Sequence, residues 1–352
     1  MEYTLSVRRY TPEYRTEWDA FVDASNNGTM FHKQAFLEYH AKGKFVFHHL
    51  MFYNGNELVG VLPCGLTNDG TTLWSPLGAS YGSLVTKDVP FALSLALVDA
   101  LLDYGRGIGL HEMFLIPPPL VYNKVLSQHQ EYAMLYRKFD FELHYISHAL
   151  PIAGKDATEQ FDKKALRDIR NILAKNDLRI EESNDIEAFY PILLDNKQRH
   201  NAVPTHSLED LKRLYELVPQ HLRLILIYYR DKPIAGSLVF LCNSSVALCF
   251  YNMLLHKYRH LRPVFLMMHD IVSWSQRHGY KWVDIGVSQV PTAEDPMTPS
   301  LSLIEFKERF NTRGFIRNTY HYSFLRNANA ENADVRNADV RDAETKDSTF
   351  GK

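Results

Sequence analysis

Residues 221–254 read HLRLILIYYRDKPIAGSLVFLCNSSVALCFYNML, and residues 263–288 read PVFLMMHDIVSWSQRHGYKWVDIGVS. The first stretch predicts two strands joined at residues 230–233 and a third strand over 244–254, because its apolar runs are rich in Ile, Leu, Val and Phe. In the second stretch, Pro263 opens a helix that Gly279 closes, and residues 281–288 predict a buried strand. Strands followed by a crossover helix and a further strand predict a mixed α/β sheet with a parallel pair at its centre.

Outward from this stretch, the chain divides into two halves with a similar order of elements. The second half opens with a predicted helix over 160–175, a strand over 178–183, and helices near 185–198 and 207–217. The first half contains predicted short helices near 18–22 and 33–39, a hairpin at Asn54-Gly55, a helix over 91–109 and a buried strand over 111–117. We therefore expect two domains, 1–151 and 152–325, that meet near Pro151-Ile152-Ala153-Gly154.

Residues 326–352 differ from the rest of the chain in composition. They are rich in Asn, Ala and Asp and contain the pentapeptide Asn-Ala-Asp-Val-Arg twice, at 332–336 and 337–341. A segment with so little apolar surface cannot offset the entropy lost on ordering. We expect a disordered C-terminal tail.

Composition excludes several classes of function. The 352 residues carry 39 Lys and Arg against 41 Asp and Glu, a balance that gives no general attraction to DNA or to anionic lipid. The three cysteines form no C-x-x-C pair, which indicates a reducing compartment. The sixteen histidines show no H-x-x-x-H or H-E-x-x-H spacing, so no metal is expected. The N-terminus carries charges where a signal peptide needs an apolar core, and no run approaches the roughly 18 apolar residues of a membrane span. A cytoplasmic protein is expected.

The second half carries six short motifs in a fixed order: Asp-x-Pro-Ile-Ala-Gly (231–236), Tyr251-Asn252, Tyr-Arg-x-x-x-Pro (258–263), His-Gly-Tyr (278–280), Trp-Val-Asp-Ile-Gly (282–286) and Glu-Phe-Lys-Glu-Arg-Phe (305–310). This ordered set resembles the GNAT-fold acyltransferase superfamily, and more closely its tandem-domain branch, which includes the FemABX-like proteins. The resemblance covers residues 152–320 well and the first half less sharply.

The resemblance implies an α/β (α+β) protein of two tandem GNAT-like domains, each a mixed central sheet flanked by helices, with a degenerate first copy. Such proteins transfer an acyl group from acyl-CoA or from an aminoacyl-tRNA to an amine. The expected function is therefore an N-acyltransferase with acyl-CoA as co-substrate and an amine of a metabolite or of a cell-wall precursor as acceptor.

The expected donor site lies between the strand that ends in Tyr251 and the helix that begins at Pro263. By resemblance, main-chain N–H groups at Asn252 and Met253 polarise the donor carbonyl. The N–H groups of the helix start, from Val264 onward, favour an anion, and three cationic or histidine side chains precede them: Arg259, His260 and Arg262. This segment lacks the glycines of the better known GNAT loop that wraps the CoA diphosphate. The alternative is that its arginines only solvate a loop and cap a helix.

Three residues are candidates for proton transfer, which acyl transfer requires. Asp284, at a strand end, and Glu305 are candidate bases, and Tyr251 is a candidate donor to the leaving group. For Asp284 the alternative is a structural carboxylate that binds turn N–H groups beside Gly286. For Tyr251 the alternative is a core aromatic residue.

Three further basic residues are candidate substrate-binding groups. By resemblance, Lys307 faces the acceptor or donor pocket, after the long loop over 288–300. Arg167 and Arg170 belong to a basic helix face that, in FemABX-like proteins, opens the second domain and faces an anionic partner. A solvated helix face is the alternative for all three.

Two other functions compete with an acyl-CoA-dependent enzyme. An aminoacyl-tRNA-dependent transferase fits the missing glycine loop, but the near-neutral charge and the lack of a long heptad insertion count against it. A non-catalytic GNAT-fold binding module is the other alternative, because a fold does not establish a function.

Overall fold

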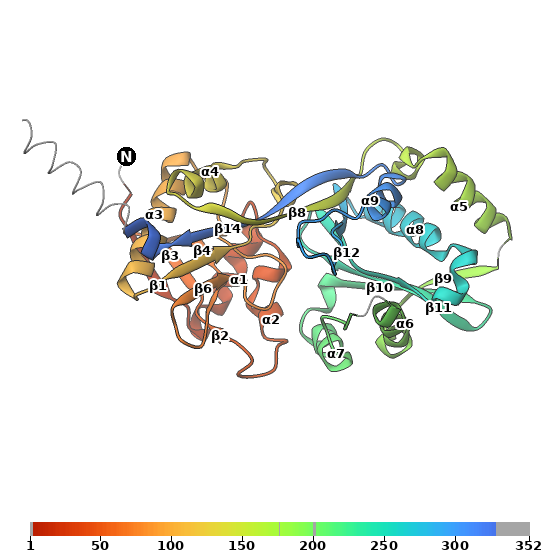
Figure 1. Cartoon of the computed structure of the whole chain (residues 1–352), viewed down its shortest axis with the longest axis horizontal. Coiled ribbons are helices and arrows are strands. Elements are labelled where there is room, and N and C mark those ends of the chain that lie inside the picture. Colours follow the sequence, from red (N-terminus) through yellow and green to blue (C-terminus); the bar gives the residue numbers. More distant parts are fainter. Residues whose placement is uncertain (1–2, 176, 200–201, 329–352) are drawn as a thin grey trace, which may run out of the picture.

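One mixed sheet runs through both halves of the molecule in the computed structural model, which describes residues 3–175, 177–199 and 202–328 (Figure 1). Its eleven strands follow the order β2-β5-β6-β7-β14-β8-β13-β12-β11-β10-β9, and β1, β3 and β4 form a separate three-stranded sheet. Two neighbouring pairs are parallel, β6 with β7 and β12 with β13. The predicted fold class, α/β with a mixed sheet flanked by helices, is confirmed, and the two halves share one sheet.

The strands of the first half are β1 (Leu5–Arg9), β2 (Val46–Phe47), β3 (Leu50–Asn54), β4 (Glu57–Leu62), β5 (Gly65–Leu66), β6 (Thr72–Ser75), β7 (Glu112–Leu115) and β8 (Asp140–Pro151). Its α-helices and short 3-10 helices are η1 (Pro12–Tyr14), α1 (Arg15–Ala24), η2 (Met30–His32), α2 (Gln34–Leu37), α3 (Phe91–Gly107), η3 (Leu120–Tyr122) and α4 (His129–Tyr136).

The strands of the second half are β9 (Leu178–Ser183), β10 (Leu222–Tyr229), β11 (Lys232–Leu241), β12 (Val246–Leu254), β13 (Trp282–Val287) and β14 (Arg313–Ser323). Its helices are η4 (Ala157–Gln160), α5 (Lys163–Lys175), α6 (Ile186–Arg199), α7 (Leu208–Leu217), η5 (Pro219–His221), η6 (His256–Leu261), α8 (Pro263–Arg277) and α9 (Leu301–Glu308). Of the predicted tail, residues 329–352 lie outside the described residues.

Local chemistry explains where several of these elements begin and end. Pro263 occupies the first turn of α8, where its missing N–H costs nothing, and Gly279 ends the helix with φ +80. Ser207 and Asp210 form a reciprocal capping box at the start of α7. Gly55, with φ +60, makes the tight turn between β3 and β4.

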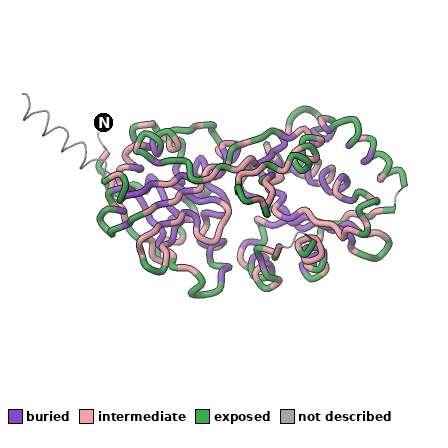
Figure 2. The backbone as a smooth tube through the Cα atoms, in the orientation of Figure 1, coloured by how far each residue is buried: buried purple, intermediate pink, exposed green. Residues whose placement is uncertain are grey.

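Helices cover both faces of the sheet in the second half (Figure 1). Leu224 and Leu226 of β10 join the core beneath α6 and α7, whereas Ile225 and Ile227 join the core beneath α5 and α8. The strand is therefore one continuous apolar run, as expected for a strand buried on both faces. The buried positions concentrate along the sheet in Figure 2.

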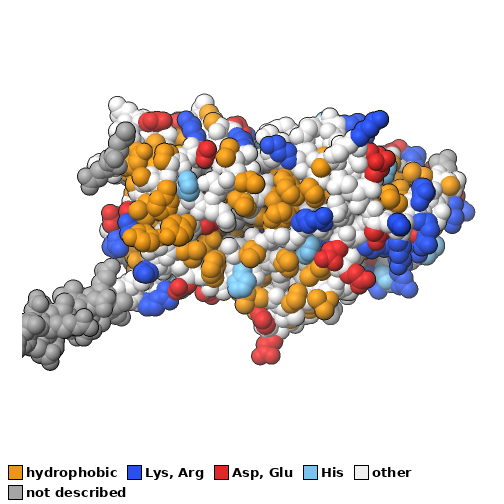
Figure 3. Space-filling view, turned by 90° about the horizontal axis from the view of Figure 1, so that it is seen from above, with side chains coloured by type: hydrophobic (Ala, Val, Ile, Leu, Met, Phe, Trp, Pro, Cys, Tyr) orange, Lys and Arg blue, Asp and Glu red, His pale blue; other side chains and the backbone are white. Residues whose placement is uncertain are grey.

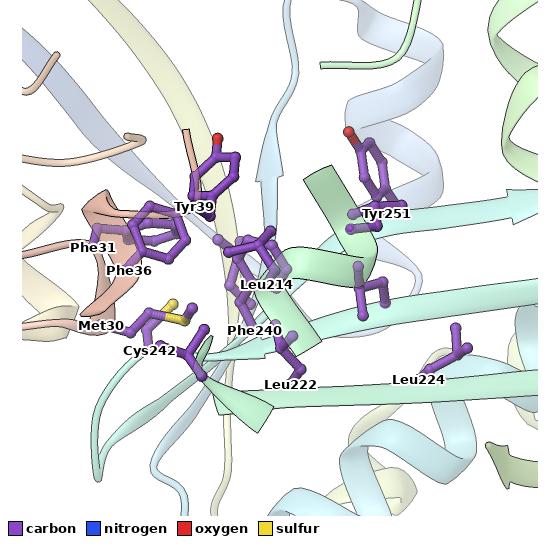
Figure 4. Close-up of a cluster of buried hydrophobic side chains, with 14 of the residues drawn as sticks. Met30, Phe31, Phe36, Tyr39, Leu214, Leu222, Leu224, Phe240, Cys242 and Tyr251 are labelled. Carbon is purple, nitrogen blue, oxygen red and sulfur yellow. The ribbon is translucent and has the colours of Figure 1, made fainter. Parts of the chain in front are cut away.

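Strand β14 joins the two halves, and no element is predicted for it from the sequence. It pairs with β8 over most of its length and then with β7 of the first half (Figure 1). A hydrophobic core also crosses between the halves: Met30, Phe31 and Phe36 of the first half pack with Phe240 and Cys242 of the second (Figure 4). The two halves thus share both a sheet and a core.

Gly82 is required by close packing, and we expect Gly82→Ala to lower the free energy of unfolding by about 1–3 kcal/mol. A Cβ atom at this position would overlap backbone atoms of Ser75 and Pro76. Gly107→Ala is the matched control, because nothing lies within 4 Å of its Cβ position and it lies in α3. That change should be neutral or stabilise by up to about 1 kcal/mol. Urea unfolding measures both, and equal midpoints for the two variants would contradict this account of Gly82.

Candidate active site

The parallel strands β12 and β13 separate where the donor site is predicted. They pair only over residues 246–248 and 282–284. On its other side, β12 has a bulge at Phe250, because Cys249 and Tyr251 pair with adjacent residues of β11. Among the described residues, no strand therefore pairs with residues 249–254 of β12 on the β13 side, which leaves their main-chain N–H and C=O groups as an open edge.

Asp284 is the last residue of β13 that pairs with β12, and its carboxylate is buried. The Gly286 N–H donates to Oδ1 at 2.7 Å, and the Ser147 hydroxyl donates to the same oxygen at 2.9 Å. The Tyr122 hydroxyl donates to Oδ2 at 2.7 Å. These three hydrogen bonds are those expected if Asp284 is a structural carboxylate that holds the turn at Gly286. A role as catalytic base stays a prediction.

Lys307, from α9, binds the same turn from the other end. Its Nζ donates to the carbonyl oxygens of Gly286 at 2.7 Å and Val287 at 2.9 Å, and the residue is only 5% exposed. Burial lowers the pKa of Lys307 to about 8, although the charges of Asp284 and of Cys249 on β12 act in the opposite direction. A buried cation thus lies beside the point where β12 and β13 separate.

The lowered pKa of Lys307 predicts a pH-dependent stability. The side chain titrates near 10.5 when unfolded and about 8 when folded, so between these values the unfolded chain binds more protons and the folded state gains stability as pH rises. Lys307→Met lacks this gain. We expect the unfolding free energy of the wild type, relative to the variant, to increase by about 1–2 kcal/mol between pH 7.5 and 9.5. Urea unfolding at the two pH values measures it, and an unchanged difference would contradict the buried ammonium.

Glu305 lies apart from this cluster. It is on α9, two residues before Lys307, and its side chain is exposed. Within residues 3–175, 177–199 and 202–328, no hydrogen bond or ion pair holds its carboxylate. Its assignment as a catalytic base stays a prediction, and its exposed position away from Asp284 gives that assignment no support.

Tyr251 belongs to a second cluster, on the face of the sheet that α6 and α7 cover. It is buried, and its hydroxyl lies 2.9 Å from Nδ1 of His206. Burial lowers the pKa of His206 to about 4 and raises the pKa of Tyr251 to about 12, so both side chains are uncharged at neutral pH. The ring of Tyr39, from the first half, packs 5.4 Å from the His206 ring, and the hydroxyls of Tyr39 and Tyr251 extend to the same side of the core in Figure 4.

Three further residues are predicted to lie near the donor carbonyl: Asn252 and Met253 on β12, and Val264 at the start of α8. Asn252 has a buried side-chain oxygen with no hydrogen-bond partner among the described residues, and its amide nitrogen contacts the sulfur of Met268 at 3.6 Å. Met253 and Val264 are half-buried and pack on opposite cores. An unpaired buried acceptor on the open edge of β12 is suited to an N–H group of a ligand.

The side chains predicted to bind phosphate already contact other groups of the protein. Arg262, the residue before α8, forms an ion pair with Asp168 of α5, and Arg309 reaches the same buried carboxylate at 3.5 Å. Arg259 contacts the ring of His256, and His260 contacts the carbonyl of Lys257. The charge of Arg262 is therefore already balanced, which is closer to the helix-capping alternative than to an open anion site.

A groove nevertheless lies beside these residues, between α5 and the start of α8. It is lined by basic, acidic, polar and apolar side chains: Arg167, Asp168, Asn171, Ile172, Lys175, Asp177, Leu178, His260, Leu261 and Arg262. Arg170 is not part of this lining; it is exposed on the same helix and contacts the carbonyl of Leu166. Lys and Arg side chains gather at this end of the molecule in Figure 3. The structure thus brings the predicted donor and substrate groups of α5 and η6 together.

Several residues of the site have no signal in the sequence. Tyr122 and Ser147 hold Asp284 from positions 162 and 137 residues away in the chain. His206, from the segment before α7, lies within hydrogen-bond distance of Tyr251. From the sequence, Asp168 is expected on the solvated face of a helix, but in the structure it is only 4% exposed. The folding of distant segments onto one another brings these pairs together.

Across the described ranges, no group of three or more His, Cys, Asp or Glu side chains is arranged to hold a metal ion. None of the helices in the described part of the chain is long and apolar enough to cross a membrane.

Comparison with known proteins agrees with this geometry. Residues 160–294 match the family model described as acetyltransferase (GNAT) domain. A crystal structure of FemX is similar over 92% of this chain and 98% of that chain, with a TM-score of 0.68 and 14% identity. No curated protein sequence matches the chain.

Two further solved structures share the whole fold. The C-terminal domain of a putative lysylphosphatidylglycerol synthetase from Agrobacterium fabrum covers 90% of this chain and 94% of that chain, with a TM-score of 0.57 and 11% identity. A tandem GNAT protein from the clavulanic acid biosynthesis pathway covers 91% and 98%, with a TM-score of 0.51 and 11% identity.

Residues 160–294 of this chain thus resemble a GNAT acetyltransferase domain, and the whole chain has the tandem GNAT fold. The resemblance to the FemABX-like branch, first seen in the ordered motifs, is confirmed at the level of the fold.

Proposed function

We propose that this protein is an N-acyltransferase that binds its acyl donor at the open edge of β12 and transfers the acyl group to a primary amine. The observation that carries the proposal is the buried ammonium of Lys307 at the end of β13, beside main-chain groups of β12 that, in the described part of the chain, have no strand partner on the β13 side. Donors of this kind, fixed in a site from which water is excluded, stabilise the charge that develops on a carbonyl oxygen during acyl transfer.

The reaction has one bond made and one broken. The amine nitrogen attacks the carbonyl carbon of the donor, negative charge collects on the carbonyl oxygen, and the bond to the carrier sulfur or oxygen then breaks. The attacking nitrogen loses a proton and the leaving group gains one. In this proposal, Lys307 and the N–H groups of β12 stabilise the negative charge on the carbonyl oxygen of the intermediate.

Tyr251 is suited to supply the proton to the leaving group. Because burial raises its pKa to about 12, the hydroxyl keeps its proton at neutral pH. In the tautomer of His206 that carries a proton on Nδ1, the histidine donates to Tyr251 and leaves the tyrosine hydroxyl hydrogen for the leaving group.

We propose acyl-CoA as the carrier, with its diphosphate in the groove between α5 and α8. Arg167, Lys175 and His260 line this groove, and the start of α8 lies at its edge. The acceptor is an amine of a metabolite or a cell-wall precursor, bound near Tyr39 and Tyr251, where the two halves meet. The chain is suited to a reducing, cytoplasmic setting, because Cys64, Cys242 and Cys249 are free and buried.

A specific observation supports a second carrier, an aminoacyl-tRNA. The segment before α8 contains no glycine, and Arg262 is paired with Asp168 instead of being free for a diphosphate. The basic face of α5 would then contact the RNA backbone.

Thermal unfolding of the full chain with CoA, acetyl-CoA and longer acyl-CoAs tests the carrier. A ligand at about 100 times its Kd adds about 2.7 kcal/mol of stability, so we expect a clear rise in Tm. A rise with aminoacyl-tRNA and none with any CoA would replace the first carrier by the second. Binding of either donor without transfer to any amine would instead support a non-catalytic binding module. Arg167→Ala should weaken the CoA effect, whereas Arg106→Ala, on the exposed surface of α3, should leave it unchanged.

A further inference from the structure

We infer that Tyr122, in the first half of the chain, is a positioning residue for the reactive turn of the second half, acting through Asp284 on the turn that Lys307 binds. The inference rests on the proposed function, because it assigns a role to the turn beside the donor site. It follows from an unbroken series of hydrogen bonds among buried groups.

Tyr122 is fixed by contacts with both halves. It ends η3, directly after Pro117, Pro118 and Pro119, whose fixed φ angles stiffen the approach. Its carbonyl accepts from the Asn243 amide at 2.9 Å, so the turn between β11 and β12 holds its main chain. Its ring packs edge-on against Tyr81, with the centroids 5.0 Å apart.

The hydroxyl of Tyr122 can act only as a donor to Asp284. Burial and the nearby Asp284 carboxylate raise the pKa of Tyr122 well above its ordinary value, so the hydroxyl stays protonated. At 2.7 Å from Oδ2, it makes a charge-assisted hydrogen bond in a dry environment. This bond fixes the rotation of the carboxylate, because Oδ1 is held from the other side by Ser147.

The oriented carboxylate then shapes the turn. Oδ1 accepts the N–H of Gly286 at 2.7 Å, and Gly286 takes the positive φ of +74 that redirects the chain. At this point β13 departs from its register with β8, between Asp284 and Val287. The carbonyls of Gly286 and Val287 both reach Nζ of Lys307 as a result.

Four charged or titratable groups face this turn or the Lys307 ammonium: Asp284, Lys307, His148 and Cys249, and burial raises the pKa of the Cys249 thiol to about 12. Asp284 and Lys307 carry opposite charges, and His148 of β8 binds the Ser288 hydroxyl at 2.9 Å, just after the turn. Burial and the Lys307 charge lower the pKa of His148, which leaves its ring uncharged at neutral pH. Asp284 and the carbonyls of Gly286 and Val287 therefore determine how strongly the Lys307 ammonium is stabilised. The positions of the carboxylate and of both carbonyls depend on Tyr122.

The test is the titration of Lys307 in the full chain, labelled with ¹³C at lysine Cε and followed by NMR. The Lys307 signal is assigned by its loss in Lys307→Arg. In Tyr122→Phe, the turn loses its fixed geometry and the two carbonyls no longer both accept from Nζ, so we expect the Lys307 midpoint to fall by about half a pH unit or more. Tyr322→Phe removes another buried tyrosine hydroxyl, far from Asp284, and should leave the midpoint unchanged.

The outcomes separate this inference from the proposed function. A Lys307 midpoint that is low in the wild type and identical in Tyr122→Phe would overturn the positioning role and leave the acyltransferase proposal standing. An ordinary midpoint in the wild type would remove the basis of both. With a transfer assay in hand, Tyr122→Phe should lower kcat several-fold while the Tm shift produced by the donor is unchanged, because Tyr122 contacts no substrate; a loss of donor binding alone would contradict positioning.

Discussion

Replacing Lys307 by methionine is expected to lower kcat for acyl transfer by about 100-fold or more, the effect of removing one donor to a developing oxyanion. Methionine keeps the length and apolar contacts of the side chain but has no N–H to offer the donor carbonyl. Donor binding should persist, because the groove between α5 and α8 is not altered.

The matched control for this prediction is Lys281→Met, which removes an exposed lysine at the other end of β13 and should keep kcat. Product formation is measured by mass spectrometry with the donor in excess. If Lys307→Met retained a kcat within threefold of the wild type, the ammonium would not act on the reacting atoms.

Asp284→Ala is expected to lower the free energy of unfolding by about 3–5 kcal/mol, because two buried hydroxyls and one half-buried N–H lose their acceptor at once. They are the hydroxyls of Tyr122 and Ser147 and the N–H of Gly286. Asp103→Ala, on the exposed face of α3, should change the stability by less than about 0.5 kcal/mol. Urea unfolding at pH 7 measures both variants, and a small effect of Asp284→Ala would contradict the structural role of the carboxylate.

Asp284→Asn separates the structural role from catalysis. The amide keeps the shape of the side chain and one oxygen for Gly286, so it should cost less stability than alanine. If the variant stays folded and kcat falls by about 1,000-fold, Asp284 is a catalytic base as well. A modest fall in kcat supports positioning alone.

The sequence predicted the second half well because its elements carry strong local signals. Strands β10 to β12 are buried on both faces and are therefore continuous apolar runs. Pro263 and Gly279 mark the ends of α8 by their own backbone preferences. None of these signals depends on distant parts of the chain.

Strand β14 was not predicted, because its sequence carries no strong local signal. Apolar residues in it do not mark buried positions consistently, since Ile316 is 63% exposed while Tyr320 and Tyr322 are buried. Pairing with β8 and β7 stabilises it, and both partners lie far away in the sequence. Strand β1 and helix α4 were likewise not predicted, and β1 owes its place to pairing with β3.

The sequence indicated individual candidate residues of the site, but it did not indicate the contacts that join them. The ordered motifs led to Asp284 and Lys307, and the structure joins them through the turn at Gly286. Glu305 was grouped with them by its nearness in sequence, yet it faces solvent. Asp168 could not be recognised as the partner of Arg262, because a helix face shows its charges in sequence without showing what packs on it.

The central claim is that the end of β13 and the open edge of β12 form an acyl-transfer site. The most direct measurement is the mass of acylated product formed when the full chain is incubated with acetyl-CoA, longer acyl-CoAs or aminoacyl-tRNAs and a panel of primary amines, for the wild type and for Lys307→Met. We expect a product with one of these donors that forms with the wild type and is about 100-fold slower with Lys307→Met. No acylated amine from any donor, with donor binding shown by a raised Tm, would contradict the claim and make the protein a binding module.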